Sequence, residues 1–139
     1  MKFLWLTVVF SSLFSCAIFG QKSDKKVVEK CGILPHCVSS IDDRESFKIK
    51  PLKHGHQNKN HAKQEIIDYL KKQPRVEIEG HSENYIHATY SSKLIGFVDD
   101  VEFFINDDIV HVRSISRIGI SDLGVNRKRV EQIRKDIFN

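Results

Sequence analysis

Apolar residues along the chain recur with two periods, one typical of helices and one typical of strands. Residues 60–73 carry apolar positions at helical spacing, with Asn60 as the expected N-cap and Pro74 just beyond the end. A second helix of this kind is predicted from Asn126, again the expected N-cap. The buried stripes would be Ala62, Ile66, Ile67 and Leu70 in the first helix, and Val130, Ile133 and Ile137 in the second.

Alternation of apolar and polar residues predicts strands elsewhere in the chain. The first would be a short edge strand ended by Pro51, because proline has no N–H to donate to a neighbouring strand. Turns at Gly80–Asn84 and Asn106–Asp108 would join the later strands into hairpins. The predicted strands are 46–52, 76–78, 85–90, 97–105 and 109–116.

The last hairpin has a predicted register. If Asp107 and Asp108 form a two-residue loop, Glu102 stands opposite Arg113 and the apolar residues of both strands share one face. A three-residue loop would instead bury charges among the valines. The apolar face would hold Val101, Phe103, Ile105, Val110 and Val112, and the opposite face Asp100, Glu102, His111, Arg113 and Arg117, with Phe104 and Ile115 indicating that it is partly covered.

These elements predict an α+β fold. We expect a two-layer sandwich in which an antiparallel sheet of four to five strands carries two helices on one face. About 120 residues remain after an N-terminal leader, which is enough for one domain with a single core. We place that domain at residues 31–139.

The N-terminus predicts export. Lys2 is followed by an apolar run, and its central part, residues 3–14, is shorter than the roughly 20 apolar residues that a spanning helix needs. Residues 1–20 are therefore predicted to be a signal peptide or lipoprotein leader. A retained anchor is disfavoured, because lysines follow the run on what would be the outer side of the membrane.

Leu13-Phe14-Ser15-Cys16 resembles a bacterial lipobox, whose cysteine is acylated and becomes the new N-terminus. Phe14 is bulkier than that pattern usually allows, and cleavage further along by ordinary signal peptidase is the alternative. With lipidation at Cys16, residues 21–30 would be a basic tether between membrane and domain. We thus expect an exported chain that is lipid-anchored to a membrane of the cell envelope.

Cys31 and Cys37 are the two cysteines beyond the leader, and an exported protein meets an oxidising compartment. The intervening Gly32 and Pro35 allow the chain to turn back, so we expect a disulfide that holds local geometry. The alternatives are free thiols or a metal site that includes His36, although adjacent ligands cannot easily reach one ion.

Charge and histidine content limit the possible partners. The chain carries 22 Lys and Arg against 18 Asp and Glu, a balance too modest to indicate nucleic acid. His54, His56 and His61 lie in a polar loop, where such residues bind a transition metal weakly or are simply solvated. We predict no metal and no cofactor.

The candidate site combines the charged residues of the last hairpin with the start of the second helix. Arg127, Lys128 and Arg129 fill the first helical turn, where the helix dipole favours negative charge, so an anion should compensate. That anion is either a carboxylate of the chain, in a structural network, or a bound phosphate, sulfate or carboxylate. The predicted ligand-binding residues are Asp99, Asp100, Glu102, Arg113, Ser116, Arg117, Asn126, Arg127 and Arg129.

A small hydrolase or isomerase is the alternative hypothesis. Asp100 and Glu102 lie two residues apart on one strand face and would act as paired acids, with His111 as the base. Nearby arginines keep carboxylates ionised, and no nucleophile–base pair or metal signature accompanies them. We therefore assign no catalytic residue and expect a non-catalytic binding module, whose partner is an anionic small molecule or an envelope protein. A purely structural envelope lipoprotein is the third hypothesis.

Residues 37–40, 96–103 and 113–131 closely resemble the family called domain of unknown function 1499, from bacteria and plastids. The chain departs from the family pattern at Gly32–His36, a segment usually richer in proline with asparagine, and at Ile120, where an aromatic residue is common. The resemblance implies a recurrent small domain, often exported or lipid-anchored. It implies no activity.

Overall fold

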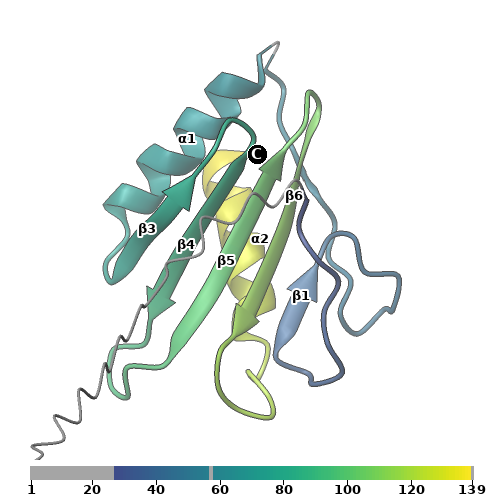
Figure 1. The fold of residues 1–139 in the computed structure, drawn as a ribbon, viewed down its shortest axis with the longest axis vertical. Helices are drawn as coiled ribbons and strands as arrows, with labels where there is room; N and C mark the ends of the chain where they lie inside the picture. Colours follow the sequence, from purple (N-terminus) through teal and green to yellow (C-terminus); the bar gives the residue numbers. More distant parts are fainter. Residues whose placement is uncertain (1–26, 57, 139) are drawn as a thin grey trace, which may run out of the picture.

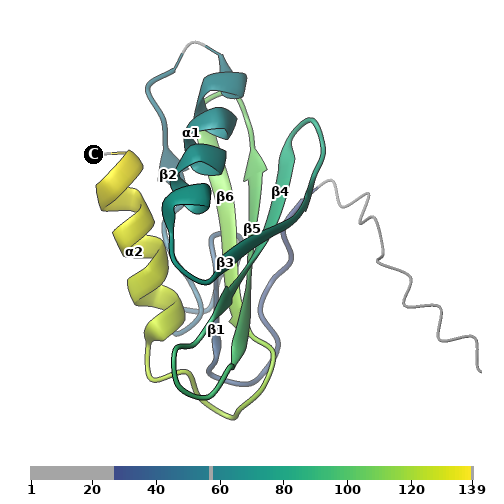
Figure 2. The same ribbon diagram turned by 90° about the vertical axis from the view of Figure 1, so that its left-hand side faces the viewer.

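Figure 1 shows the computed structural model, which describes residues 27–56 and 58–138. Six strands and two helices form one antiparallel sheet with both helices on one face (Figure 2), so the fold is α+β, as predicted. The elements are β1 (Cys37–Ser39), β2 (Leu52–Lys53), α1 (Lys59–Lys72), β3 (Val76–His81), β4 (Tyr85–Ser91), β5 (Val98–Ile105), β6 (Ile109–Ser116) and α2 (Val125–Ile137).

The sheet has six strands, whereas the sequence predicted four to five. Its order is β1-β6-β5-β4-β3, and β2 also pairs with β6, beside β1 on the edge away from β5. Strands as short as β1 and β2, with three and two residues, are too short to show alternation in the sequence.

The predicted strand at residues 46–52 is wrong in its position. Only a single bridge, between Lys48 and Ser39, joins that segment to β1, and β2 begins at Leu52, after Pro51 rather than before it. The carbonyls of Lys50 and Pro51 accept hydrogen bonds from the Arg134 side chain of α2, so this backbone binds the helix and not a neighbouring strand.

The predicted register of the last hairpin is confirmed. Glu102 pairs with Arg113, and the Asn106 N–H donates to the Ile109 carbonyl at 2.8 Å, which closes the two-residue loop Asp107-Asp108. The apolar face of this hairpin packs against the helices. Its members Val101, Phe103, Ile105, Val110 and Val112 are all buried in the main core.

The helices complete that core. All four predicted residues of α1 are buried, and Val130 and Ile133 of α2 are buried with Ile137 packed beside them. The predicted caps are wrong. Asn58 caps α1, its side chain accepting from the Asn60 N–H at 2.8 Å, and α2 begins at Val125, so Asn126 lies inside its first turn.

The segment before β1 lies on the face of the sheet opposite the helices (Figures 1 and 2). Val28 is only 1% exposed, and the Glu29 carbonyl accepts a hydrogen bond from Ser39 Oγ at 2.8 Å. The last residues of the stretch predicted as a tether therefore contact the sheet. The predicted leader, Cys16 included, lies outside the described residues.

All described strands, both helices, the main core and the disulfide lie within residues 27–138. A chain that begins at Gln21 therefore contains all the core contacts described for residues 27–138, and we expect it to fold on its own.

Candidate functional site

The sheet divides eight of the nine predicted site residues between its two faces. Successive residues of a strand point to opposite faces, so Asp99 and Asp100 separate. The helix side holds Asp99, Ser116, Asn126 and Arg129, which we call the helix-side network together with Ser114 and Asp122. The other side holds Asp100, Glu102, Arg113 and Arg117, which we call the open-face network together with Tyr85 and His87.

Asn126 is the centre of the helix-side network. Its side chain is fully buried between α2 and the sheet. The Oδ1 atom accepts hydrogen bonds from Ser114 Oγ and from the Arg129 guanidinium, and Nδ2 donates to Ser116 Oγ at 3.0 Å and to the His36 carbonyl at 3.0 Å. One amide thus joins α2, β6 and the loop before β1.

Arg129 supplies the positive charge of this network. It pairs with Asp99 at 2.6 Å, both side chains being 12% exposed, and its guanidinium lies 4.6 Å from the centre of the Tyr90 ring. For Arg129, the negative charge expected beside the first turn of α2 is a carboxylate of the chain itself.

A second carboxylate, that of Asp122, completes the helix start. It accepts hydrogen bonds from the backbone N–H groups of Gly124 and Asn126, at 2.9 and 3.0 Å. Burial raises the pKa of Asp122, but these hydrogen bonds outweigh it and hold the pKa below its ordinary value. Asp122 thus takes the capping role that the sequence assigned to Asn126.

On the open face, Glu102 is 4% exposed and lies between two donors from neighbouring strands. Tyr85 Oη donates to one carboxylate oxygen, and Arg113 Nη1 donates to the other at 2.9 Å. Burial, and then the hydrogen bond to Glu102, raise the pKa of Tyr85 well above its ordinary value. The phenol therefore stays protonated and remains a donor.

Asp100 occupies the next position on this face and is bound from both sides. Arg117 donates to both carboxylate oxygens at 2.8 Å, and His87 Nε2 lies 2.7 Å from Oδ1. Burial raises the pKa of Asp100, but the hydrogen bonds from Arg117 and His87 outweigh burial and hold the pKa well below its ordinary value.

Two further candidates lie apart from these contacts. His111 stands opposite Phe104, and its Nδ1 lies 3.2 Å from Ser40 Oγ. Arg127 points away from both networks and donates to the Ser46 carbonyl at 3.1 Å. The nine residues therefore do not converge on one point.

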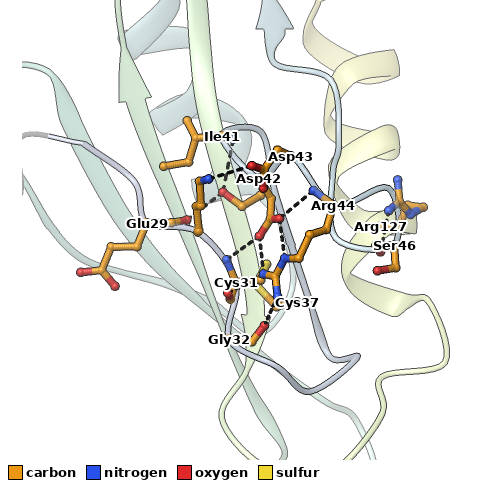
Figure 3. Close-up of polar contacts among 12 residues, drawn as sticks. Glu29, Cys31, Gly32, Cys37, Ile41, Asp42, Asp43, Arg44, Ser46 and Arg127 are labelled. Carbon is orange, nitrogen blue, oxygen red and sulfur yellow. Dashed lines mark hydrogen bonds and ion pairs between the residues drawn. A yellow bond between two sulfur atoms is a disulfide. The ribbon is translucent and has the colours of Figure 1, made fainter.

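The disulfide between Cys31 and Cys37 is present, as predicted, and closes a loop with a sequence separation of 6. Figure 3 shows a second device beside it that the sequence analysis missed, the contact between Asp42 and Arg44. Asp42 is 2% exposed and accepts from the Cys31 N–H at 2.9 Å, while Arg44 donates to the carbonyls of Cys31 and Gly32. Acid and base two residues apart, just after the second cysteine, are a weak signal for such a contact.

Hydrogen bonding holds the pKa of Asp42 well below its ordinary value, with the Arg44 side chain as the largest cause. Arg44 also lies 4.1 Å from the centre of the Phe47 ring. We call Asp42 and Arg44 the clasp, because together they fix the backbone on the N-terminal side of the disulfide.

The histidine cluster has ordinary partners. His54 Nε2 lies 2.9 Å from the Asn106 carbonyl and His56 Nε2 lies 2.8 Å from Glu65, with the His54 and His56 rings stacked. Within residues 27–56 and 58–138, no three His, Cys, Asp or Glu side chains are grouped so that they could hold a metal ion.

Exposed apolar side chains gather at one end of the molecule, an arrangement that was not predicted from the sequence. Ten large apolar residues are exposed within the described chain, and nine of them belong to residues 32–36, 92–97 and 117–125. These three loops, which we call the loop end, lie together at the lower end of Figures 1 and 2. The nine are Ile33, Leu34, Leu94, Ile95, Phe97, Ile118, Ile120, Leu123 and Val125.

One backbone hydrogen bond joins two of the three loops, and a second joins the loop after β6 to the first residue of β5. The Asp122 N–H donates to the Pro35 carbonyl at 3.3 Å, and the Arg117 N–H donates to the Val98 carbonyl at 3.0 Å. The signal in the sequence was the apolar pair Leu94-Ile95 inside a turn, and the apolar alternation that continues past β6 into Ile118 and Ile120.

Comparison with known proteins gives one match. The sequence model of a family described as "Protein of unknown function (DUF1499)" matches residues 27–137. No curated protein matches the chain, and no solved structure does. Within the described residues, no helix has the length and apolar character to cross a membrane.

Proposed function

Since the chain belongs to the DUF1499 family, whose function is unknown, we propose from its own geometry that it is a non-catalytic interaction module of the cell envelope. Its contact surface in this proposal is the loop end. The leader at residues 1–20, with its lipobox-like Cys16, supports the envelope location and a lipid anchor.

The observation that carries the proposal is the concentration of nine of the ten exposed large apolar side chains in three adjoining loops. Single exposed apolar residues are normal on a protein surface, but a contiguous group marks a site of contact with a protein or a membrane. The two helices support this interpretation, because the main core buries the apolar stripe of α1 and Val130 and Ile133 of α2, with Ile137 partly buried beside them.

The polar networks support a non-catalytic role. A general base works best with a pKa near the working pH, whereas the pKa of Asp100 is lowered and its oxygens already accept from Arg117 and His87. Glu102 is buried between Tyr85 and Arg113. The enzyme hypothesis based on Asp100, Glu102 and His111 is thus the weaker one.

The same contacts bear on the anionic ligand expected from the sequence. Arg113, Arg117 and Arg129 each bind a carboxylate of the chain, so an external anion at these residues would have to displace Glu102, Asp100 or Asp99. Arginines committed in this way favour a structural network over a binding site. An anion at the loop end needs no such displacement.

Position-specific cross-linking of the full chain in the cells that produce it tests the proposal. A photoreactive residue at Leu94 or Leu123 should form a covalent product with another molecule, whereas the same residue at Lys135, exposed in the last turn of α2, should not. Equal yields at the three positions would contradict an interaction surface at the loop end.

A further inference from the structure

We propose that the partner of the loop end is the surface of a bilayer that contains anionic lipids. The inference rests on the proposed function and names its partner. Three properties of the loop end carry it: the exposure of its apolar side chains, their chemical type and the charge around them.

The apolar side chains of the loop end are highly exposed. Each of the three loops presents one side chain that is almost completely accessible, Ile33 at 88%, Leu94 at 92% and Leu123 at 87%. A side chain that lines a groove for a peptide is half-buried by the walls of the groove. These side chains instead project from the surface, which suits insertion between lipid headgroups.

The chemical type of the exposed side chains distinguishes a membrane partner from a protein partner. The nine exposed residues are isoleucines, leucines, one valine and one phenylalanine. Protein interfaces are enriched in aromatic residues, Met and Arg, and their energetic centres are poor in Leu and Val; one of the nine residues is aromatic. The transfer of aliphatic side chains from water to hydrocarbon lowers the free energy and needs no shaped pocket.

Charge selects the type of lipid. Lys93 lies in the loop between β4 and β5, and Lys128 lies in the first turn of α2, both exposed and beside the apolar residues. The acid in these loops is Asp122, whose carboxylate already accepts from the N–H groups of Gly124 and Asn126. Exposed lysines next to a membrane surface are attracted to anionic headgroups.

The loop backbone holds the apolar side chains outward. Leu123 has a φ of 51°, a conformation that costs a bulky residue free energy and persists only when neighbouring contacts impose it. Those contacts are the hydrogen bonds of Ser121 and Asp122 to the following N–H groups. The surface is therefore already shaped before it meets a partner.

Sedimentation with lipid vesicles tests the proposal on the chain from Gln21, which contains the complete core but not the apolar leader. Vesicles of phosphatidylcholine with phosphatidylglycerol are compared with vesicles of phosphatidylcholine alone. The wild type should sediment with the anionic vesicles, and the double variant Leu94→Ser/Ile95→Ser should bind them at least tenfold more weakly. Both residues are exposed, so melting temperature should not change.

The cationic part has its own matched pair of variants. Lys93→Gln/Lys128→Gln should weaken binding to anionic vesicles, whereas Lys53→Gln/Lys135→Gln, with the same charge change at β2 and in the last turn of α2, should not. Raised salt should weaken the wild type in the same direction.

Two results would overturn the membrane proposal: a wild type that remains in solution with both kinds of vesicle, or a Leu94→Ser/Ile95→Ser variant that binds as the wild type does. If the wild type remains in solution while Leu94 and Leu123 cross-link to a protein in cells, the partner is a protein and the interaction module stands. If the wild type binds neither kind of vesicle and forms no cross-link in cells, both proposals fail.

Discussion

At the scale of single residues, the hydrogen bonds of the buried Asn126 side chain are expected to stabilise the fold. Its amide is fully buried and joins α2 to Ser114, Ser116 and the His36 carbonyl. Truncation would leave several buried polar groups without a partner, each of which costs about 1–3 kcal/mol.

We therefore expect Asn126→Ala to lower the free energy of unfolding by about 3 kcal/mol, measured by urea denaturation of the chain from Gln21. Gln132→Ala is the matched control, because Gln132 lies on the same helix with its side chain in solvent. Equal midpoints for the two variants would show that the Asn126 contacts do not stabilise the fold.

The ionisation of Asp100 makes the stability that the open-face network contributes depend on pH. Its pKa is lower in the folded protein than the ordinary value of 3.8, so the folded state favours the ionised form. The stabilisation is present above that ordinary value and is lost as the pH falls through it toward the lower folded pKa. Asp100→Asn should therefore lose less stability than the wild type between pH 5 and pH 3.

Urea denaturation at several pH values measures that difference. Asp42 and Asp122, whose pKa values are also lowered, keep part of the acid dependence in the variant. Asp107→Asn, in the exposed turn after β5, is the control and should follow the wild type. Parallel curves for Asp100→Asn and the wild type would contradict the ion pair with Arg117.

The sequence named most residues of the two polar networks but combined them in one site, and the structure separates them. Asp99 and Asp100 are neighbours on one strand, and alternation alone places them on opposite faces. Both were expected to compensate the cationic first turn of the second helix. Asn126 was identified as important for the wrong reason, since a cap and a buried amide at a helix start share the same residue type.

At the scale of elements, the clasp fixes the chain ahead of β1. Asp42→Asn should weaken the contact with Arg44 and release the Cys31 N–H, because a neutral amide accepts more weakly than a carboxylate. Faster hydrogen exchange at the Cys31 amide is the expected result, measured by NMR. Asp43→Asn is the matched control, since the Asp43 side chain is exposed and pairs with Lys30 at the surface.

A Cys31 amide that exchanges equally fast in both variants would show that the disulfide alone holds this segment. The disulfide itself was predictable, because the N-terminus predicts export and a glycine and a proline between the two cysteines allow the chain to turn back.

Long elements were predicted well and short ones poorly, for a physical reason. The stripe of α1 and the alternation of β5 and β6 extend over enough residues for the period to be visible. β1 and β2 are ordered by the edge of β6 rather than by their own pattern. Tertiary pairing of this kind has no local signature.

At the scale of the whole molecule, the position of Val28 extends the folded unit beyond the disulfide. Val28→Ser should lower the free energy of unfolding by about 2 kcal/mol, because a buried valine contributes about that much by leaving water. The adjacent Val27→Ser is the control, since Val27 is 57% exposed and its replacement should change stability by less than about 0.5 kcal/mol.

Urea denaturation of both variants gives the comparison, and equal midpoints would mean that the folded unit begins at Cys31.

The loop end is the other whole-molecule property, and it was not visible in the sequence. Apolar residues are normally interpreted as core, and only the arrangement of three distant loops shows that Ile33, Leu94 and Leu123 face outward together.

The two edges of the sheet have a consequence for solutions at high concentration. One edge is divided between β1 and β2, which are three and two residues long, and the other, β3, has an irregularity between Ile78 and Gly80 and carries Glu77 and Glu79. Short, bulged or acidic edge strands are poor templates for a strand from a second molecule. The sheet should therefore not extend from one molecule to the next, and the protein should resist fibril formation despite the apolar side chains exposed at its loop end.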